Sequence, residues 1–594
     1  MYSFGGFRLE ADGTLFRGQT PVYLPPKELA ALRLLLAHAG QILTHRQLRS
    51  ALWGELNVPG DTLSKCISSL RARLQPEECI QTVYKRGYCF SAPVRHYGAG
   101  LFEALPRLAI TPFVTEHEAP EYLGSAVAEE TAARLNTAHP ATAFVLPRDS
   151  VFTLARRGCS AQQIGERLQA DFVLTGTLRL LPAHYRLRAE VIRVKDGVQL
   201  WVEDLFVERS RVGGLEVELV NSLAFHLYNR GPSISAAAAE PASGQESSPQ
   251  QREAFEIFQR AHYEWQSLQR HHMQDGLQRL LRAVDLDPSL VAARVDLANL
   301  CVTQTVYGFM SPPVAADIVR RTAAPGPQSG GAAVSGGRGE EPASDLALSN
   351  EAILPALGWV QFHVDRDLPA ALRAFALSDH LPHDPWITRA RTMFSLSRHR
   401  FGEAIATLRA AIDLDPYSPW LQARLGWALH LAGETSASMQ QIEHAVAQFP
   451  EDACARLYGA VILAYNGDPE RAVERAQELT RRYPYFDLAT AVHAYALACA
   501  GHADETRTIL QRLDWLSRER FVLNTFAAAA YVVLGEHDAA LAELRKADQV
   551  RCPWFFQMLA DPRLKPLHKD PEFAKMRAIL TKMEADAARD TEQE

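Results

Sequence analysis

The chain has 594 residues, of which 47% are hydrophobic and 22% charged, and its formal net charge is −7. A single hydrophobic core stops growing at roughly 250–300 residues, so this length predicts several domains. The composition is that of a soluble globular protein, and the negative charge argues against a chain that coats nucleic acid along its whole length.

Cysteine usage and hydropathy indicate the compartment. The eight cysteines form no Cys-x-x-Cys pair and no zinc spacing, and most lie in apolar runs, which predicts reduced, buried thiols. The N-terminus lacks the basic and then apolar pattern of a signal peptide. No apolar run reaches the roughly 18 residues that a membrane span needs. We therefore expect a cytoplasmic protein with no metal, no cofactor and no membrane partner.

The first 60 residues predict a small sheet followed by two helices. Residues 1–24 alternate weakly between apolar and polar side chains and contain the turn Asp12-Gly13, as expected for short antiparallel strands. A leucine-rich helix follows. Thr44 and Gln47 then form a capping box, which predicts a second helix that runs to about Trp53.

The stretch 61–74 predicts a helix with one apolar and one basic face, N-capped by Asp61. The apolar stripe, at spacings of four, three and four residues, consists of Leu63, Ile67, Leu70 and Leu74. The other face holds Thr62, Lys65, Ser68 and Ser69, flanked by Arg71 and Arg73. Residues 62–74 include no acid. Such a face suits a DNA major groove, where a helix approaches base edges closely and basic side chains meet phosphates.

A basic hairpin is predicted directly after this helix. Residues 80–84 alternate as a strand would, Lys85-Arg86-Gly87 forms the tip, and 88–90 returns. From 45 to 95 there are eight Lys and Arg residues against four acids, so a basic module lies in an acidic chain. The alternative is that 61–74 is an ordinary solvated surface helix.

These elements together carry a family resemblance. The run from Leu24 to Phe90, with the pattern IxTVxxxGYxF in its wing, resembles the winged helix-turn-helix output domain of OmpR/PhoB-type response regulators. The resemblance covers essentially 4–91. No receiver module with a phosphoacceptor aspartate accompanies it, so we expect no phosphorelay control within this chain.

The OmpR/PhoB resemblance implies roles for individual residues. Base-edge or phosphate contacts are implied for Thr62, Lys65, Ser68 and Ser69, and phosphate contacts for Arg71 and Arg73. Lys85 and Arg86 would form the wing tip over an adjacent minor groove. Thr44 and Arg46, at the start of the second helix, complete the candidate DNA-binding set. Trp53, Leu70 and Tyr88 are expected in the core.

Residues 105–229 predict an α/β domain with a mixed sheet. Strands are expected at 107–113, 142–147, 171–180, 184–194 and 198–207, and helices at 121–136, 149–157, 160–169 and 213–229. The phrases LAITPF, ADFVLTGTLR and GVQLWVEDL resemble the TolB-amino-terminal-like domain, which implies no particular ligand. Gly124 and Gly176 lie in neither a GxxxxGK[ST] nor a GxGxxG motif. A dimerisation or coupling module is therefore preferred to a nucleotide-binding one.

A 34-residue period marks the C-terminal part. After a linker at 230–250, prolines recur at Pro382, Pro416, Pro450 and Pro484, and alanines share the same frame at Ala370, Ala404, Ala472 and Ala540. This period resembles tetratricopeptide repeats, which implies a curved helical solenoid over 251–582 whose concave face binds peptides or other proteins. Residues 323–344 are of low complexity and predict a disordered insert. Scattered histidines such as His271, His272 and His399 have no partners at ligand spacing.

The predicted fold is thus multidomain. It comprises a winged helix-turn-helix (α+β) domain at 1–96, an α/β mixed-sheet domain at 105–229, and an all-α tetratricopeptide solenoid. This order resembles HilA/CadC-like transcriptional regulators. The resemblance implies a non-enzymatic regulator of promoter DNA, an activator in preference to a repressor, with RNA polymerase or other proteins on the repeats and room for a homodimer. The alternatives are a protein-interaction scaffold and a nucleotide sensor that uses the middle domain.

Overall fold

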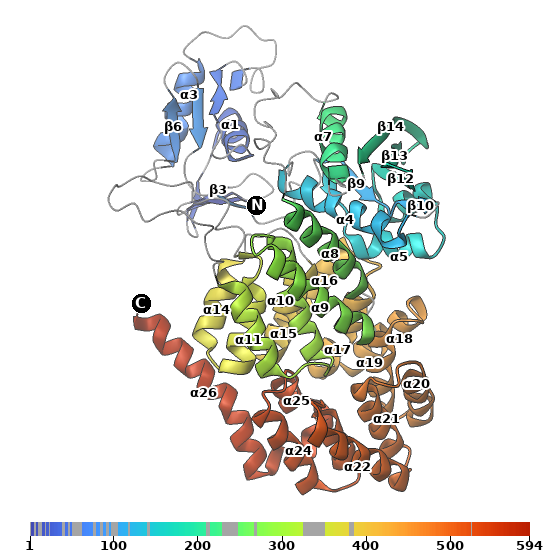
Figure 1. The fold of residues 1–594 in the computed structure, drawn as a ribbon. Coiled ribbons are helices and arrows are strands. Elements are labelled where there is room, and N and C mark those ends of the chain that lie inside the picture. The colour runs from blue at the N-terminus through green and yellow to red at the C-terminus, as the bar shows by residue number, and fades with distance from the viewer. Residues whose placement is uncertain are drawn as a thin grey trace, which may run out of the picture. The chain divides into compact units, whose positions relative to one another are not determined.

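The computed structural model divides into two units, Met1–Pro106 and Arg107–Glu594, which are described separately (Figure 1). Up to residue 100 the structure describes 2–4, 7–9, 15–17, 20–22, 24–37, 42–45, 48–49, 62–74, 79–83, 87–90 and 94–96. Beyond it the described stretches are 105–116, 119–138, 143–208, 214–228, 248–265, 270–324, 351–378, 385–523 and 525–593.

The first unit begins with the small antiparallel sheet that the sequence predicts. Its order is β4-β3-β2-β1-β8, and its strands are β1 (Tyr2–Phe4), β2 (Phe7–Leu9), β3 (Leu15–Arg17), β4 (Thr20–Val22) and β8 (Val94–His96). Alternate side chains face the core, where Phe4 meets Phe90 edge-on at 5.2 Å between ring centroids. The predicted turn Asp12-Gly13 lies outside the described residues.

A second sheet carries the predicted wing. Its strands are β5 (Ile42–Thr44), β6 (Ile80–Val83) and β7 (Gly87–Phe90), in the order β5-β7-β6 with antiparallel pairing throughout. The helices of this unit with given bounds are α1 (Pro26–Ala37) and α3 (Thr62–Arg73). Strand β5 was not predicted, and Thr44 is its last residue. Asp61, Trp53 and the wing tip at 84–86 lie outside the described residues.

The second unit opens with the predicted mixed sheet. Its order is β11-β9-β12-β13-β14, and its strands are β9 (Arg107–Ile110), β10 (Val114–Glu116), β11 (Phe144–Val145), β12 (Phe172–Leu180), β13 (His184–Arg193) and β14 (Val198–Glu208). Strands β9, β10, β11 and β12 pair in parallel, whereas β12, β13 and β14 are antiparallel. The short strand β10 was not predicted.

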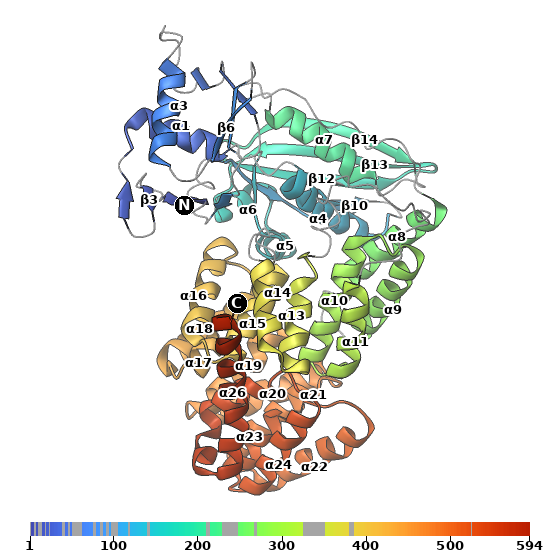
Figure 2. The same ribbon diagram turned by 90° about the vertical axis from the view of Figure 1, so that its left-hand side faces the viewer.

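The expected helices accompany this sheet. They are α4 (Glu121–Ala138), α5 (Arg148–Arg156), α6 (Ala161–Leu168) and α7 (Leu215–Tyr228). Helix α6 starts with a capping box between Ser160 and Gln163. Helix α7 packs along β14, beside which β13 and β12 follow (Figure 2).

Helix pairs with the predicted 34-residue period form the array. First helices are α15 (Pro385–Ser397), α17 (Pro419–Leu431), α19 (Ala453–Tyr465) and α21 (Asp487–Cys499). Second helices are α16 (Phe401–Leu414), α18 (Thr435–Gln448), α20 (Pro469–Arg482), α22 (Ala503–Glu519) and α24 (His537–Gln549). The flanking elements are α8 (Pro249–Trp265), α9 (Arg270–Leu286), α10 (Val291–Val306), α11 (Pro312–Ala323), α13 (Leu354–Val360), α14 (Leu368–Leu377), α23 (Thr525–Val533), α25 (Phe555–Ala560) and α26 (Pro571–Gln593). The insert 323–344 lies mostly outside the described residues.

The turn within each helix pair explains part of the period. Gly433, Gly467, Gly501 and Gly535 all have positive φ angles, between 76° and 89°. Glycine is favoured there because it has no Cβ to clash in the left-handed conformation. In the preceding repeat the same position is His399, at φ 59°. Of the predicted small residues, Ala404, Ala472 and Ala540 are fully buried between helices, whereas Ala370 is partly buried.

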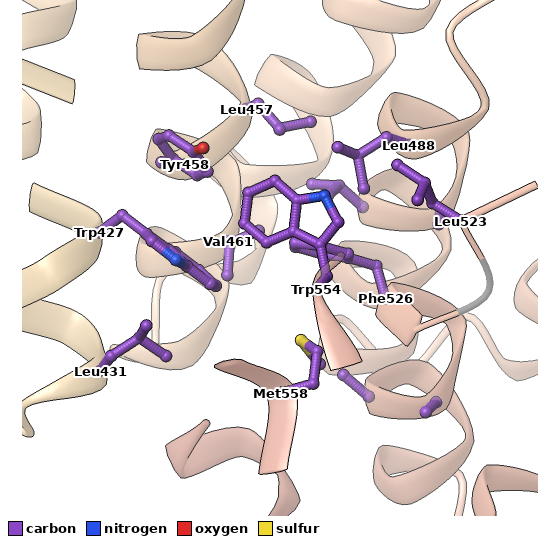
Figure 3. Packing of buried hydrophobic residues seen from close by; sticks show 14 of the residues in the cluster. Trp427, Leu431, Leu457, Tyr458, Val461, Leu488, Leu523, Phe526, Trp554 and Met558 are labelled. Carbon is purple, nitrogen blue, oxygen red and sulfur yellow. The ribbon is translucent and has the colours of Figure 1, made fainter. Parts of the chain in front are cut away.

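The interior of the array is filled by the protein's own aromatic side chains. Trp554, which precedes α25, meets Phe526 edge-on at 5.2 Å and lies 6.1 Å from Trp427 (Figure 3). The Trp554 indole also donates a hydrogen bond of 2.8 Å to the carbonyl oxygen of Val306, in α10. These contacts join repeats that are far apart in sequence, so the end of the array closes onto its beginning.

A polar junction joins the middle domain to the array inside the second unit. The Ser150 amide donates to the Asp415 carboxylate at 2.9 Å, and the Ser418 hydroxyl donates to Asp149 at 3.0 Å. His262 of α8 lies between Glu129 of α4, at 2.6 Å, and Asp296 of α10, at 2.5 Å. Burial by itself would lower the pKa of His262, but the two carboxylates raise it well above 6.5.

This junction should weaken as the pH rises through neutrality. Burial, followed by the nearby Asp149 carboxylate, raises the pKa of Asp415 from 3.8 to about 7. Because the folded pKa exceeds the unfolded one, the stabilisation by protonated Asp415 is complete below pH 4 and is lost as the pH rises through 7. Asp415→Asn keeps the acceptor for Ser150, so its melting temperature should exceed that of the wild type by several degrees at pH 8 and by less at pH 5. Asp413→Asn, at an exposed position two residues earlier, should show no such pH-dependent difference in thermal unfolding.

Candidate nucleic-acid interface

Helix α3 has the two faces that the sequence predicts. Leu63, Ile67 and Leu70 are at most 1% exposed and pack into the core of the first unit. The opposite side is solvent-exposed and consists of Ser64, Lys65, Ser68 and Ala72. Since these side chains are small apart from the single lysine, the helix backbone can approach another surface closely.

Two predicted contact residues are held by the neighbouring helix. The Ser69 hydroxyl donates a hydrogen bond of 2.7 Å to one oxygen of Glu28, in α1. The Arg73 guanidinium pairs with the other oxygen at 2.8 Å. Glu28 is 8% exposed and Arg73 keeps 37% of its side-chain surface in solvent. The carboxylate therefore joins α3 to α1, and part of the Arg73 side chain remains exposed to solvent.

Arg71 connects α3 to the wing. Its guanidinium donates to the Ile80 carbonyl oxygen at 3.0 Å and to the Thr82 hydroxyl at 2.8 Å, both in β6. It also lies 5.7 Å from the centre of the Tyr88 ring. The Tyr88 hydroxyl lies 3.5 Å from the Ser64 hydroxyl, so Tyr88 of β7 also contacts α3. These contacts fix the angle between the helix and the hairpin.

The other predicted residues are distributed as follows. Thr62 is half-buried at the start of α3, and Thr44 is exposed at the end of β5. Arg46, Lys85 and Arg86 lie outside the described residues. Ser64 was missed by the sequence analysis, although its spacing of four residues from Ser68 places both on one helix face.

The exposed side of α3 has no carboxylate of its own. The helix has no acid in its first turn, and Arg71 and Arg73 are the basic residues of its last turn. The nearest described acid is Glu28, which Ser69 and Arg73 already engage. An anion such as a phosphate can therefore approach Lys65 without meeting a like charge on α3.

Within the described residues, the structure contains no group of three or more His, Cys, Asp or Glu side chains placed to hold a metal ion. No helix in the described part of the chain is long and apolar enough to cross a membrane. None of the described cysteines takes part in a disulfide bond.

Gly87 should be indispensable to the wing. A Cβ atom at this position would lie 1.9 Å from the carbonyl oxygen of Leu43 and 2.8 Å from the Cα of Thr44. Gly87→Ala must therefore push β7 away from β5, and we expect a loss of about 2 kcal/mol or more in the stability of the first unit. Hydrogen exchange of the β5 and β7 amides measures this. Gly402→Ala has no atom within 4 Å of its new Cβ and should leave the exchange unchanged.

Comparisons with known proteins agree with this geometry. Residues 18–90 match the family "Transcriptional regulatory protein, C terminal", and 395–461 match tetratricopeptide repeats. Transcriptional regulator HilA of Salmonella typhimurium is 26% identical over 316 residues, 52% of this chain and 54% of HilA. Regulatory protein VanRB of Enterococcus faecalis is 39% identical over 83 residues, 14% of this chain and 34% of VanRB. Among solved structures, MamA aligns at 19% identity and a TM-score of 0.20, over 27% of this chain and 94% of MamA.

The chain spans about half the length of the HilA relatives that it matches. The two matched modules are a regulatory domain and a repeat, both of which are non-enzymatic classes. The predicted resemblance to OmpR/PhoB-type domains and to tetratricopeptide repeats is thereby confirmed. The chain is therefore similar to HilA over about half its length, and it carries a regulatory domain of the OmpR/PhoB type that is followed by tetratricopeptide repeats.

Proposed function

We propose that this protein is a sequence-specific DNA-binding transcriptional regulator that acts as an activator. Helix α3 enters the major groove, and the β6–β7 hairpin lies over the neighbouring minor groove. Phosphate contacts supply most of the affinity, and base-edge contacts supply the sequence preference. The proposal rests on the match of residues 18–90 to a transcriptional regulatory domain.

The observation that carries the proposal is the outward side of α3. Ser64, Lys65 and Ser68 are exposed there, and the helix is fixed behind them through Glu28 and Arg71. Serine can donate to or accept from a base edge, whereas lysine favours guanine O6 and N7 or a phosphate. A rigid helix with short polar side chains supports close docking better than it supports a role as a solvated surface helix.

The remaining roles in this proposal follow the family pattern. Thr62 and Ser69 flank the reading face, and Arg71 and Arg73 contact phosphates beside it. Lys85 and Arg86 occupy the minor groove, while Thr44 and Arg46 meet the phosphate backbone beside the second helix.

The rest of the chain supplies partners and control in this proposal. The domains are 1–96, 105–229 and 251–582, with a linker at 230–250 and an insert at 323–344. The TolB-like middle domain couples or dimerises the protein. The array binds RNA polymerase or another protein through its outer surface, where Tyr485 and Trp515 are 68% and 58% exposed. Exposed aromatic side chains are common anchors of protein interfaces.

Genome-wide mapping of bound sites, followed by affinity measurements on the recovered DNA, tests the proposed function. A regulator should recover discrete promoter sequences, and the logarithm of its affinity should fall linearly with the logarithm of the salt concentration. Recovery of no enriched sequence, or binding that is insensitive to salt, would favour a scaffold. A rise in melting temperature with ATP or a cyclic nucleotide would favour a nucleotide sensor.

A further inference from the structure

The middle-domain sheet ends in a long strand that has one unpaired side. Strand β14 pairs with β13, and among the described residues no strand pairs with its other side (Figure 2). Residues 198–208 contain neither proline nor lysine, the residues that commonly protect such edges. The register of β13 and β14 shifts between Val191 and Ile192, so a bulge interrupts β14 near Leu200. The stretch from Trp201 to Glu208 is regular.

The two faces of this regular stretch differ. On one face Leu205 and Val207 are 6% and 5% exposed, beneath α7. On the other face Val202 and Phe206 are 38% and 56% exposed. The register of the sheet also brings Val114 of β10, 59% exposed, to this second face, through its pairing with Thr177 in β12. The part of this second face that β13 and β14 form is therefore open to solvent and carries apolar side chains up to the edge, whereas α5 and α6 pack on β9 and the start of β12.

Charged side chains on the open face are already ordered. Asp204, between Val202 and Phe206, accepts two hydrogen bonds from Arg186 of β13, at 2.9 and 3.1 Å. Arg188 lies directly opposite Asp204 in the register. The Arg186 guanidinium lies 5.9 Å from the centre of the Phe206 ring. The edge thus presents a neutralised carboxylate with an apolar residue on each side.

We propose that β14 pairs antiparallel with β14 of a second copy of this chain, with Asp204 on the two-fold axis. In this register each Val202 lies opposite Phe206 of the other copy, so every exposed apolar side chain of the regular stretch gains an apolar neighbour. The two Asp204 carboxylates face one another, and Arg186 and Arg188 of each copy offset their repulsion. The result is one continuous sheet across the dimer.

The registers centred on the two preceding residues fit the edge less well. If the axis passed through Glu203, the two Glu203 side chains of the dimer would face one another. Their neighbour in β13 is Ala189, so no arginine would offset their repulsion. Centring the axis on Val202 would bring the bulge at Leu200 opposite Asp204. In an antiparallel pair, two residues that lie directly opposite one another point to the same face of the sheet. The two-fold axis must therefore pass through a residue and not between two residues.

Sedimentation velocity of the full chain without DNA tests the dimer. Because DNA is absent, the result is independent of the proposed DNA binding. The wild type should dimerise at micromolar concentration, and Val202→Lys should weaken self-association by roughly tenfold or more, because a charge then replaces an apolar contact on both sides of the axis. Val114→Lys adds the same charge to the same face in β10, which β12 and β13 separate from β14, and it should leave the dimer intact.

The register has its own test. Asp204→Asn removes the like charges on the axis while leaving an acceptor for Arg186, so it should tighten the dimer. The double variant Val202→Cys and Phe206→Cys should form a covalent dimer on oxidation. The single variant Phe206→Cys should form no more covalent dimer than the wild type does. A monomeric wild type, or equal dissociation of the Val202→Lys and Val114→Lys variants, would overturn the proposal. A weaker Asp204→Asn dimer would overturn the register.

Discussion

Replacing Lys65 with glutamate should weaken DNA binding by roughly ten- to a hundredfold, since one contact of this kind is worth about 1–3 kcal/mol. Lys65 and Arg73 are the exposed basic side chains of α3, but Arg73 already pairs with Glu28, and α3 itself contains no acidic residue. The slope of the logarithm of affinity against the logarithm of salt concentration should also become shallower by about one, because one phosphate contact is lost. Fluorescence anisotropy over a salt series measures both quantities.

A matched control separates this effect from net charge. Arg481→Glu changes the charge of the whole chain by the same amount at an exposed position of α20, in the array. It should leave both the affinity and the salt slope close to those of the wild type. Equal losses in the two variants would show that Lys65 acts only through the overall charge, and the proposed reading face would then be wrong.

Asp561→Ala should destabilise the array by about 3–5 kcal/mol, the usual cost of leaving one partner of a buried ion pair alone. Asp561 and Arg563 are both fully buried and lie 2.7 Å apart, and Asp561 also accepts a hydrogen bond from the Arg563 amide. Burial alone would raise the pKa of Asp561, but Arg563 and His430 hold it far below 3.8. Its contribution is therefore present above pH 4 and lost in acid. Denaturant unfolding measures the loss.

A double variant tests the cause of this loss. The Arg563 guanidinium lies over the rings of Tyr495, Phe526 and Trp427, so a methionine at 563 would find an apolar environment. Asp561→Ala combined with Arg563→Met should therefore recover much of the stability that Asp561→Ala alone removes. A double variant no more stable than the single one would mean that the lost backbone contact of Asp561, not the uncompensated charge, is responsible.

Elements with a strong periodic pattern could be predicted from the sequence. The repeat helices begin 34 residues apart, and α3 buries the stripe Leu63, Ile67 and Leu70. The short strands β5 and β10 could not be predicted, because neither lies in a longer alternating run such as 1–24, and their stability comes from their neighbours. The filled interior of the array was also missed, because a repeat pattern describes adjacent helices and not contacts such as Trp554 to Val306.

Prediction of the candidate site from the sequence is limited in the same way. The outward position of Lys65 and Ser68 follows from helix periodicity alone. The engagement of Ser69 and Arg73 by Glu28 depends on a residue 41 positions from Ser69 and on the angle between two helices. Arg71 was expected to meet phosphates, and its contacts with Ile80 and Thr82 arise from the way the wing folds back beside α3. A linear pattern gives the side of a helix but not the tertiary partner.

Closure of the array changes how the repeats should melt. An open solenoid couples each repeat only to its neighbours, so its ends can fray while its middle persists. Here Arg366 pairs with Asp548 at 2.8 Å, and Arg398 pairs with Glu584 at 2.8 Å, across more than 180 residues in each case. Loss of the last helices would therefore remove contacts from the early ones, and the repeats should unfold together in a single cooperative transition.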